Sequence, residues 1–127
     1  MNVLLTGGLG FIGSHTAVEL INAGHHVVIY DNLCNAEIGV LTRIEKITGV
    51  RPILLVEDIR HQAPLSMALK QYQIDVVIHF AALKAVGESV QKPLEYYENN
   101  IGGTLSLLRA MKEARVKNIV FSSSATV

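Results

Sequence analysis

The 127-residue sequence contains little of several residue types, and each shortage narrows what the chain can be. Cys34 is the only cysteine, so no disulfide can form within the chain, which suits a reducing compartment. An excess of charge is also missing, because eleven basic residues balance eleven acidic residues without a run of either sign. A surface for nucleic acid or anionic lipid needs a basic patch, so we expect neither partner.

Long apolar runs are absent as well. No stretch approaches the roughly 20 apolar residues that a membrane-spanning helix needs. The first apolar run, residues 3–5, is too short for the core of a signal peptide. We therefore expect no membrane contact and a cytoplasmic location. No group of His, Cys, Asp and Glu has metal-ligand spacing, so we also expect no metal site.

The apolar residues that are present, half of the chain, follow a regular pattern. Runs rich in valine, isoleucine and leucine predict strands buried on both faces at residues 3–5, 27–30, 53–56, 76–80 and 119–121. Helical periodicity between these runs predicts helices at residues 11–23, 40–47, 64–72 and 93–114. Pro64 and Pro93 fall in the first turns of their helices, where a missing N–H costs nothing.

This alternation of short strands and helices predicts an α/β fold in one domain. Such units form a parallel sheet with right-handed crossovers. The doubly wound arrangement would give the strand order 3-2-1-4-5. The usual sixth strand is not among the 127 residues. We therefore expect a doubly wound parallel sheet that is truncated after its fifth strand.

The segment from Thr6 to His15, TGGLGFIGSH, follows the first predicted strand and opens the first predicted helix. Gly7 and Gly10 permit a tight turn and let the backbone approach a pyrophosphate, while Gly13 lets the helix pack close to the sheet. The N-terminus of the helix offers N–H groups and a positive dipole end to phosphates. Strand, turn, helix and spacing together favour a dinucleotide-binding Rossmann fingerprint over a plain glycine-rich connection.

Asp31 ends the second predicted strand, 18 residues after Gly13. An acidic residue at this place accepts hydrogen bonds from the ribose hydroxyls of a bound dinucleotide. Its carboxylate would repel the additional phosphate of NADP, and no basic residue follows before Arg43. The alternative is a solvated loop aspartate, but together with the glycine turn the position favours NAD. We therefore expect residues 1–127 to form one NAD-binding Rossmann domain.

Four longer sequence segments indicate a more specific family. Residues 31–35 (DNLCN), 79–89 (HFAALKAVGES), 92–100 (KPLEYYENN) and 121–127 (FSSSATV) resemble the UDP-glucose 4-epimerase family, within the extended short-chain dehydrogenase/reductase superfamily. The resemblance covers the whole chain in order. Residues 83–89 are the most specific, because they separate this family from most nucleotide-sugar dehydratases and reductases of the superfamily.

The resemblance implies an isomerase of galactose metabolism with tightly bound NAD. In this family a tyrosine takes the proton from the sugar 4-hydroxyl while C4 gives a hydride to NAD. The 4-keto sugar turns over and the hydride returns to its opposite face, which interconverts UDP-glucose and UDP-galactose. The resemblance further implies a UDP-hexose substrate and a homodimer for the full-length protein.

The resemblance also implies roles for individual residues. Ser124 would hydrogen-bond to the sugar 4-hydroxyl and help to relay its proton. The residues implied to bind NAD are Gly7, Gly10, Phe11, Ile12 and Gly13 at the pyrophosphate, Asp31, Asn32 and Asn35 at the adenosine ribose, Asp58 and Ile59 at the adenine, Phe80, Ala81 and Ala82 along the cofactor, Lys84 at the nicotinamide ribose or phosphate, and Asn99 on the nicotinamide side.

One departure from the family concerns the catalytic base. The family uses the tyrosine of a Tyr-x-x-x-Lys motif, whose spacing places both side chains on one helix face so that the lysine lowers the tyrosine pKa. None of the four tyrosines here has a lysine four positions on. We therefore expect an N-terminal fragment that lacks the substrate domain, binds NAD and does not catalyse epimerisation by itself.

Several residues have plainer interpretations. Ser122, Ser123 and Ser124 could simply end a strand, Lys84 could be a solvated loop lysine, and Asn99 could bond locally. His79 in its apolar run is a core histidine rather than a ligand. The 93–114 helix has an apolar stripe that could pack on the sheet, while its other face could join a homodimer. That stripe consists of Leu94, Tyr97, Ile101, Leu105 and Leu108.

Two glycines in the middle of that helix, Gly102 and Gly103, lower its intrinsic stability by about 1 kcal/mol each. They could permit close approach to another backbone or to the cofactor. For the function as a whole, two alternatives stay open. One is another nucleotide-sugar enzyme of the superfamily, either an epimerase that uses N-acetylhexosamines or a 4,6-dehydratase. The other is a non-catalytic NAD-binding module.

Overall fold

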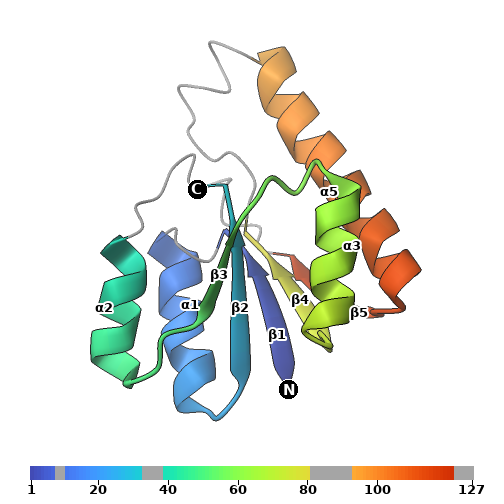
Figure 1. Cartoon of the computed structure of the whole chain (residues 1–127). Coiled ribbons are helices and arrows are strands. Elements are labelled where there is room, and N and C mark those ends of the chain that lie inside the picture. Colours follow the sequence, from blue (N-terminus) through green and yellow to red (C-terminus); the bar gives the residue numbers. More distant parts are fainter. Residues whose placement is uncertain (8–10, 33–38, 81–92, 122–127) are drawn as a thin grey trace.

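The computed structural model describes residues 1–7, 11–32, 39–80 and 93–121, and for Phe11 and residues 93–101 the description covers the backbone alone. Strands and helices alternate along these residues (Figure 1). The strands are β1 (Asn2–Thr6), β2 (His26–Asp31), β3 (Ile53–Val56), β4 (Val76–His79) and β5 (Asn118–Phe121). The helices are α1 (Phe11–Asn22), α2 (Gly39–Thr48), α3 (Gln62–Gln71) and α5 (Pro93–Ala114).

The five strands form one parallel sheet in the order β3-β2-β1-β4-β5, which confirms the predicted α/β fold and strand order. In the register of the central strands, Leu5 of β1 lies opposite Ile29 of β2 and Ile78 of β4. Because β2 and β4 both flank β1, chain segments far apart in sequence end together at one edge of the sheet.

Helices cover both faces of this sheet (Figure 1). Side chains alternate between the faces along a strand, so Leu4 and Tyr30 join the buried cluster that includes α3 and α5. Leu5 and Ile29 join the cluster on the other face, which includes residues of α1 and α2. The two clusters explain why the inner residues of β1 and β2, 3–5 and 27–30, are all apolar.

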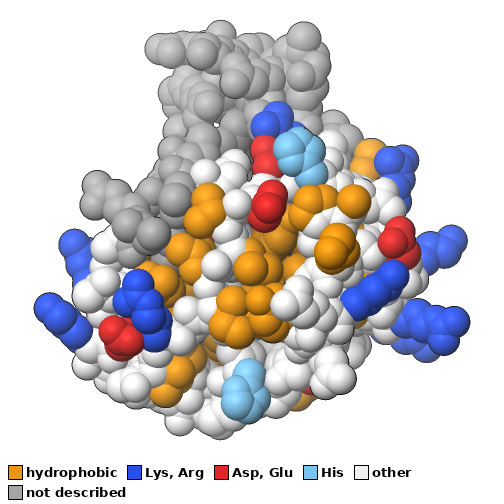
Figure 2. All heavy atoms as spheres, viewed as in Figure 1, with side chains coloured by type: hydrophobic (Ala, Val, Ile, Leu, Met, Phe, Trp, Pro, Cys, Tyr) orange, Lys and Arg blue, Asp and Glu red, His pale blue; other side chains and the backbone are white. Residues whose placement is uncertain are grey.

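The prediction of burial on both faces is correct for β1 and β2 but wrong for the outermost strands. Ile53 and Val56 of β3 are 44% and 51% exposed, and Val120 and Phe121 of β5 are 53% and 51% exposed. Apolar side chains accordingly gather in the middle of the face shown in Figure 2, where β3 runs between α2 and α3 in Figure 1. An outermost strand has one sheet neighbour and lies at the margin of the helical layers, so apolar composition alone did not reveal its exposure.

The predicted apolar stripe of α5 is also wrong where it can be tested. Leu105 and Leu108 are 45% and 42% exposed, whereas Leu107, Ala110 and Met111 are buried. The buried face begins at Gly103 and Ser106. The inner face combines small residues with Leu107 and Met111, so the spacing of the predicted stripe did not identify it. Leu94, Tyr97 and Ile101 have side chains outside the described residues.

Candidate functional site

Four connections meet at the carboxyl edge of the sheet. Gly7 follows β1 directly, Asp31 ends β2, Asp58 lies two residues after β3, and Phe80 follows β4. Helix α1 begins at the same edge, with Phe11. Open parallel sheets bind ligands at this edge, outside the carboxyl ends of their strands. The structure therefore places the described candidates around one region.

Gly7 has a backbone conformation that favours glycine. Its φ angle is +74°, in the left-handed region, and its N–H donates a hydrogen bond of 2.9 Å to the carbonyl of Tyr30. A residue with a Cβ atom would be strained there. The chain then leads to α1, whose first turn contains no acidic residue. A glycine at the end of β1, followed by a helix without an acidic residue in its first turn, is what an anion-binding turn requires.

Two further residues of the glycine segment lie on α1. Gly13 is buried, which agrees with close packing of the helix on the sheet, while Ile12 is 42% exposed. Gly10 lies outside the described residues, and Phe11 is placed by its backbone alone.

Asp31 is 6% exposed at the end of β2, opposite Val56 of β3 in the sheet register. Asn32 follows and is exposed. The end of β2 lies next to the end of β1, so Asp31 sits on the strand adjacent to the glycine turn. A carboxylate at this place matches the acidic residue of a dinucleotide fingerprint in both spacing and topology.

After β3, Asp58 closes a tight turn. Its carbonyl accepts the N–H of His61 at 3.0 Å, and its carboxylate accepts the backbone N–H of Arg60 at 2.9 Å. The Arg60 guanidinium donates to both carboxylate oxygens, with Nη2 2.6 Å from Oδ2 and Nε 3.1 Å from Oδ1. The hydrogen bonds from the Arg60 side chain hold the pKa of Asp58 below its usual value, although partial burial opposes them. Asp58 is therefore a fixed anionic acceptor at neutral pH.

A polar network joins the ends of β1 and β4, and the sequence interpretation missed it. Thr6 Oγ1 lies 2.6 Å from His79 Nδ1, and the N–H of Phe80 donates to the carbonyl of Thr6 at 2.8 Å and to its Oγ1 at 3.0 Å. His79 Nε2 also lies 3.4 Å from Thr104 Oγ1 of α5. His79 is 6% exposed, which confirms it as a core histidine. Thr6 and His79 are polar residues within two apolar strands, and that signal could have revealed the pair.

Tyr30 is a buried tyrosine near this edge. Burial raises its pKa above the ordinary value, and the neighbouring Glu57 and Asp58 raise it further. Its hydroxyl has no hydrogen-bond partner among the described residues. A phenol held neutral in this way is unsuited to serve as a base.

Other predicted site residues lie outside the described part of the chain: Gly10, Asn35, Ala81, Ala82, Lys84 and Ser124. Asn99 lies on α5, where the backbone alone is placed. Within the described ranges, no three His, Cys, Asp or Glu residues are grouped to hold a metal ion. None of the helices so described is long and apolar enough to cross a membrane.

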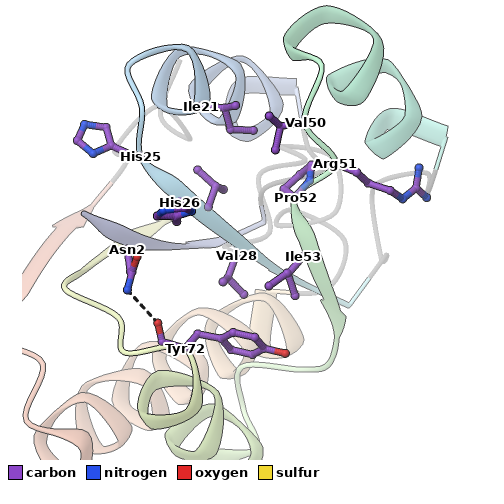
Figure 3. Close-up of a pocket in the computed structure, with 11 residues that line it drawn as sticks. Asn2, Ile21, His25, His26, Val28, Val50, Arg51, Pro52, Ile53 and Tyr72 are labelled. Carbon is purple, nitrogen blue, oxygen red and sulfur yellow. Dashed lines mark hydrogen bonds between the residues drawn. The ribbon is translucent and has the colours of Figure 1, made fainter.

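A cavity of about 360 Å³ lies at the opposite end of the sheet (Figure 3). It is lined by the first residues of three strands, Asn2, His26 and Ile53, and by Tyr72, whose carbonyl accepts a 3.2 Å hydrogen bond from Asn2 Nδ2. Figure 3 shows Arg51 extending away from it. Because the cavity is at the amino ends of the strands, it is not part of the carboxyl-edge site.

Several known proteins are similar to this chain in sequence and fold. The protein-family model described as GDP-mannose 4,6 dehydratase matches residues 4–127. The UDP-glucose 4-epimerase of Klebsiella pneumoniae is 57% identical over 127 residues, which are 100% of this chain and 91% of that relative. The chain belongs to the UDP-glucose 4-epimerase family. The Yersinia pestis UDP-glucose 4-epimerase is 59% identical over the whole chain, which spans 38% of that relative's length.

Solved structures of this family agree with the fold. UDP-glucose-4-epimerase from Stenotrophomonas maltophila, with bound NAD and formylated UDP-arabinopyranose, matches with a TM-score of 0.97 and 53% identity. The Bifidobacterium longum UDP-glucose 4-epimerase, in complex with NAD+ and UDP, matches with a TM-score of 0.95 and 51% identity. Both matches cover 100% of this chain and 38% of the other.

Proposed function

We propose that these residues form the NAD-binding part of a UDP-glucose 4-epimerase, which interconverts UDP-glucose and UDP-galactose. The observation that carries the proposal is the turn after β1, where Gly7 with a φ of +74° leads into α1 beside the buried Asp31. This pair fits a dinucleotide: the turn and the helix N-terminus receive the pyrophosphate, and the carboxylate receives the ribose hydroxyls. The family membership supplies the reaction.

In this proposal the described residues bind different parts of NAD. Gly7 and Gly13 bring backbone N–H groups close to the phosphates, together with Ile12 on the first turn of α1. Asp31 and Asn32 hold the adenosine ribose. Asp58 and Ile59 flank the adenine, with the Asp58 carboxylate accepting a hydrogen bond from the exocyclic amino group. Phe80, fixed to Thr6 by two hydrogen bonds, lines the path of the cofactor.

The proposal extends to residues that the structure does not describe or places by backbone alone, on the strength of the resemblance in sequence. Asn99 lies on the nicotinamide side. The others are Gly10 and Phe11 at the pyrophosphate, Asn35 at the ribose, Ala81 and Ala82 along the cofactor, and Lys84 at the nicotinamide ribose or phosphate. The whole domain, residues 1–127, is one NAD-binding unit in this proposal.

Bound NAD supplies a hydride acceptor that can return the hydride to the sugar carbon. Ser124 would orient the sugar 4-hydroxyl and relay its proton to a base. No tyrosine among these 127 residues has a lysine four positions on. We therefore propose that residues 1–127 alone bind NAD but do not convert UDP-galactose.

The proposal is tested on the 127-residue chain and on the longer protein of which it would be a part. Calorimetric titration with NAD is expected to give one binding site on each. A coupled assay for UDP-galactose conversion is expected to give turnover only with the longer protein. Conversion by the 127 residues would refute their dependence on a base elsewhere. Absence of NAD binding by both proteins would overturn the function itself.

A second function is favoured by one observation, the match to the GDP-mannose 4,6 dehydratase family model. A dehydratase would eliminate water from its nucleotide sugar, whereas an epimerase conserves the mass of the sugar. Incubation with UDP-glucose, UDP-N-acetylglucosamine and GDP-mannose, followed by mass spectrometry, separates these reactions. We expect UDP-glucose to give an epimer of the same mass that chromatography separates from it, whereas a product lighter by one water would favour the dehydratase.

We also propose a homodimer, supported by Leu105 and Leu108, which are 45% and 42% exposed on the outer face of α5. Exposed apolar residues one helical turn apart are typical of a helix that packs against a partner. Sedimentation equilibrium is expected to give twice the mass of one chain. Substitution of both leucines by lysine should produce the monomer, and an unchanged dimer would show that another surface pairs.

A further inference from the structure

Gly103 of α5 packs directly against Ile59 in the turn after β3. A Cβ atom built on Gly103 would lie 2.7 Å from Cδ1 and 2.9 Å from Cγ1 of Ile59. Carbon atoms that are not bonded normally stay about 3.5–4.0 Å apart. The neighbouring Gly102 differs, because a Cβ atom there would have nothing within 4 Å. Of these two adjacent glycines, only Gly103 therefore has a steric reason to lack a side chain.

Ile59 has little room to move away. It is 8% exposed and belongs to the buried cluster that includes Leu65 and Leu107. Rotation of its terminal methyl would relieve only the contact at Cδ1, since Cγ1 is too close as well. An alanine at position 103 would therefore require a different χ1 rotamer of Ile59 or a shift of its backbone.

A shift of Ile59 would be passed on to Asp58. The turn is closed by the bond from His61 N–H to the Asp58 carbonyl at 3.0 Å and by the bond from Arg60 N–H to the Asp58 carboxylate at 2.9 Å. The Arg60 side chain adds a salt bridge of 2.6 Å to the same carboxylate. Ile59 stands between the residues joined by these bonds, so the turn moves as one unit.

We propose that Gly103 is a positioning residue for adenine recognition: its missing Cβ lets α5 seat Ile59, and the rigid turn then holds the Asp58 carboxylate where it meets the adenine amino group. The inference rests on the proposed function, in which Asp58 accepts that hydrogen bond. In this arrangement the packing of α5 through Gly103 determines where the turn after β3 holds the adenine end of the dinucleotide. Gly103 itself does not touch the cofactor in this arrangement.

The test compares Gly103→Ala with the matched control Gly102→Ala in the full protein freed of nucleotide. Both variants gain the same helix propensity, but only Gly103→Ala meets Ile59. The ligands are NAD and nicotinamide hypoxanthine dinucleotide, in which a carbonyl oxygen replaces the adenine amino group. The wild type and Gly102→Ala are expected to bind NAD about tenfold more tightly than the hypoxanthine analogue, as one hydrogen bond to a carboxylate predicts. Gly103→Ala should lose most of this preference.

The ratio of the two dissociation constants separates positioning from a general loss of stability, which would weaken both ligands alike. The double variant Gly103→Ala with Ile59→Ala removes both close carbons, so it should recover part of the preference, and its effects should not be additive. If Gly103→Ala does not fold, the ratio of dissociation constants of the double variant is compared with that of Ile59→Ala alone. An unchanged ratio in Gly103→Ala, or strict additivity in the double variant, would overturn the inference. Failure of the wild type to bind NAD would instead overturn the proposed function.

Discussion

The turns after β1 and after β3 present polar groups at the same edge of the sheet in two different ways. The β1 turn depends on backbone freedom, because Gly7 adopts a φ of +74° that other residues rarely take. The β3 turn depends on side chains, because Asp58 is fixed by Arg60 and Ile59 is seated against Gly103. A turn that depends on backbone conformation can be predicted from a glycine pattern. A turn that depends on packing cannot, because a partner such as Gly103 is distant in sequence.

The largest effect is expected from Gly7→Ala, which removes the backbone freedom of the β1 turn. We expect a loss of about 1–2 kcal/mol in the free energy of unfolding from the left-handed backbone, and at least tenfold weaker NAD binding because a Cβ atom stands in the path of the phosphate. Gly49→Ala is the control, since Gly49 has a similar φ of +76° with nothing within 4 Å of an added Cβ. Urea denaturation and NAD titration measure the two effects. If Gly49→Ala weakens NAD binding equally, the effect at Gly7 is only structural.

A second effect, on stability without a predicted loss of NAD binding, is expected from Thr6→Val, which removes the hydroxyl that joins the ends of β1 and β4. His79 would lose its 2.6 Å partner and the Phe80 N–H its 3.0 Å contact, while the shape of the side chain is kept. A buried polar group left without its partner costs about 1–3 kcal/mol. Thermal or urea denaturation checks this value. Thr6→Ser, which keeps the hydroxyl, should restore most of the stability, and a neutral effect of Thr6→Val would show that the hydroxyl bonds are dispensable.

The smallest effect concerns pH and the β3 turn. Because the folded pKa of Asp58 is lowered, chiefly by its hydrogen bonds from Arg60, its stabilisation is fully present above the unfolded pKa of about 3.9. It is lost as the pH falls through the lower folded value. Asp58→Asn should therefore cost about 0.2–1 kcal/mol at pH 7, since the Arg60 side chain of the ion pair is 48% exposed and solvent screens the attraction. Urea denaturation of both proteins between pH 2 and pH 7 is expected to show this difference shrinking in acid, whereas a difference independent of pH would exclude the charge as its cause.

Much of the fold followed from local pattern. The strand order was predicted correctly, and the bounds of α5 agree with the predicted 93–114. The failures share a cause. The exposed Leu105 and Val120 were expected to be buried because they are apolar, yet burial depends on which neighbour covers a side chain. Pro64 lies in the first turn of its helix as predicted, where N–H groups need no partner within the helix, although α3 begins two residues before the predicted start, at Gln62.

The sequence by itself determined the alternation of strands and helices, the glycine at a left-handed turn after β1 and the acidic residue that ends β2. These features depend on the conformational preferences and spacing of residues near one another in the chain. Only the tertiary structure decided that Thr6 meets His79, that Ile59 packs against Gly103 and that Leu107, rather than Leu105 or Leu108, lies on the inner face of α5. Each of these depends on an approach between distant segments, which is fixed by how the helices pack on the sheet and leaves no periodic trace in the sequence.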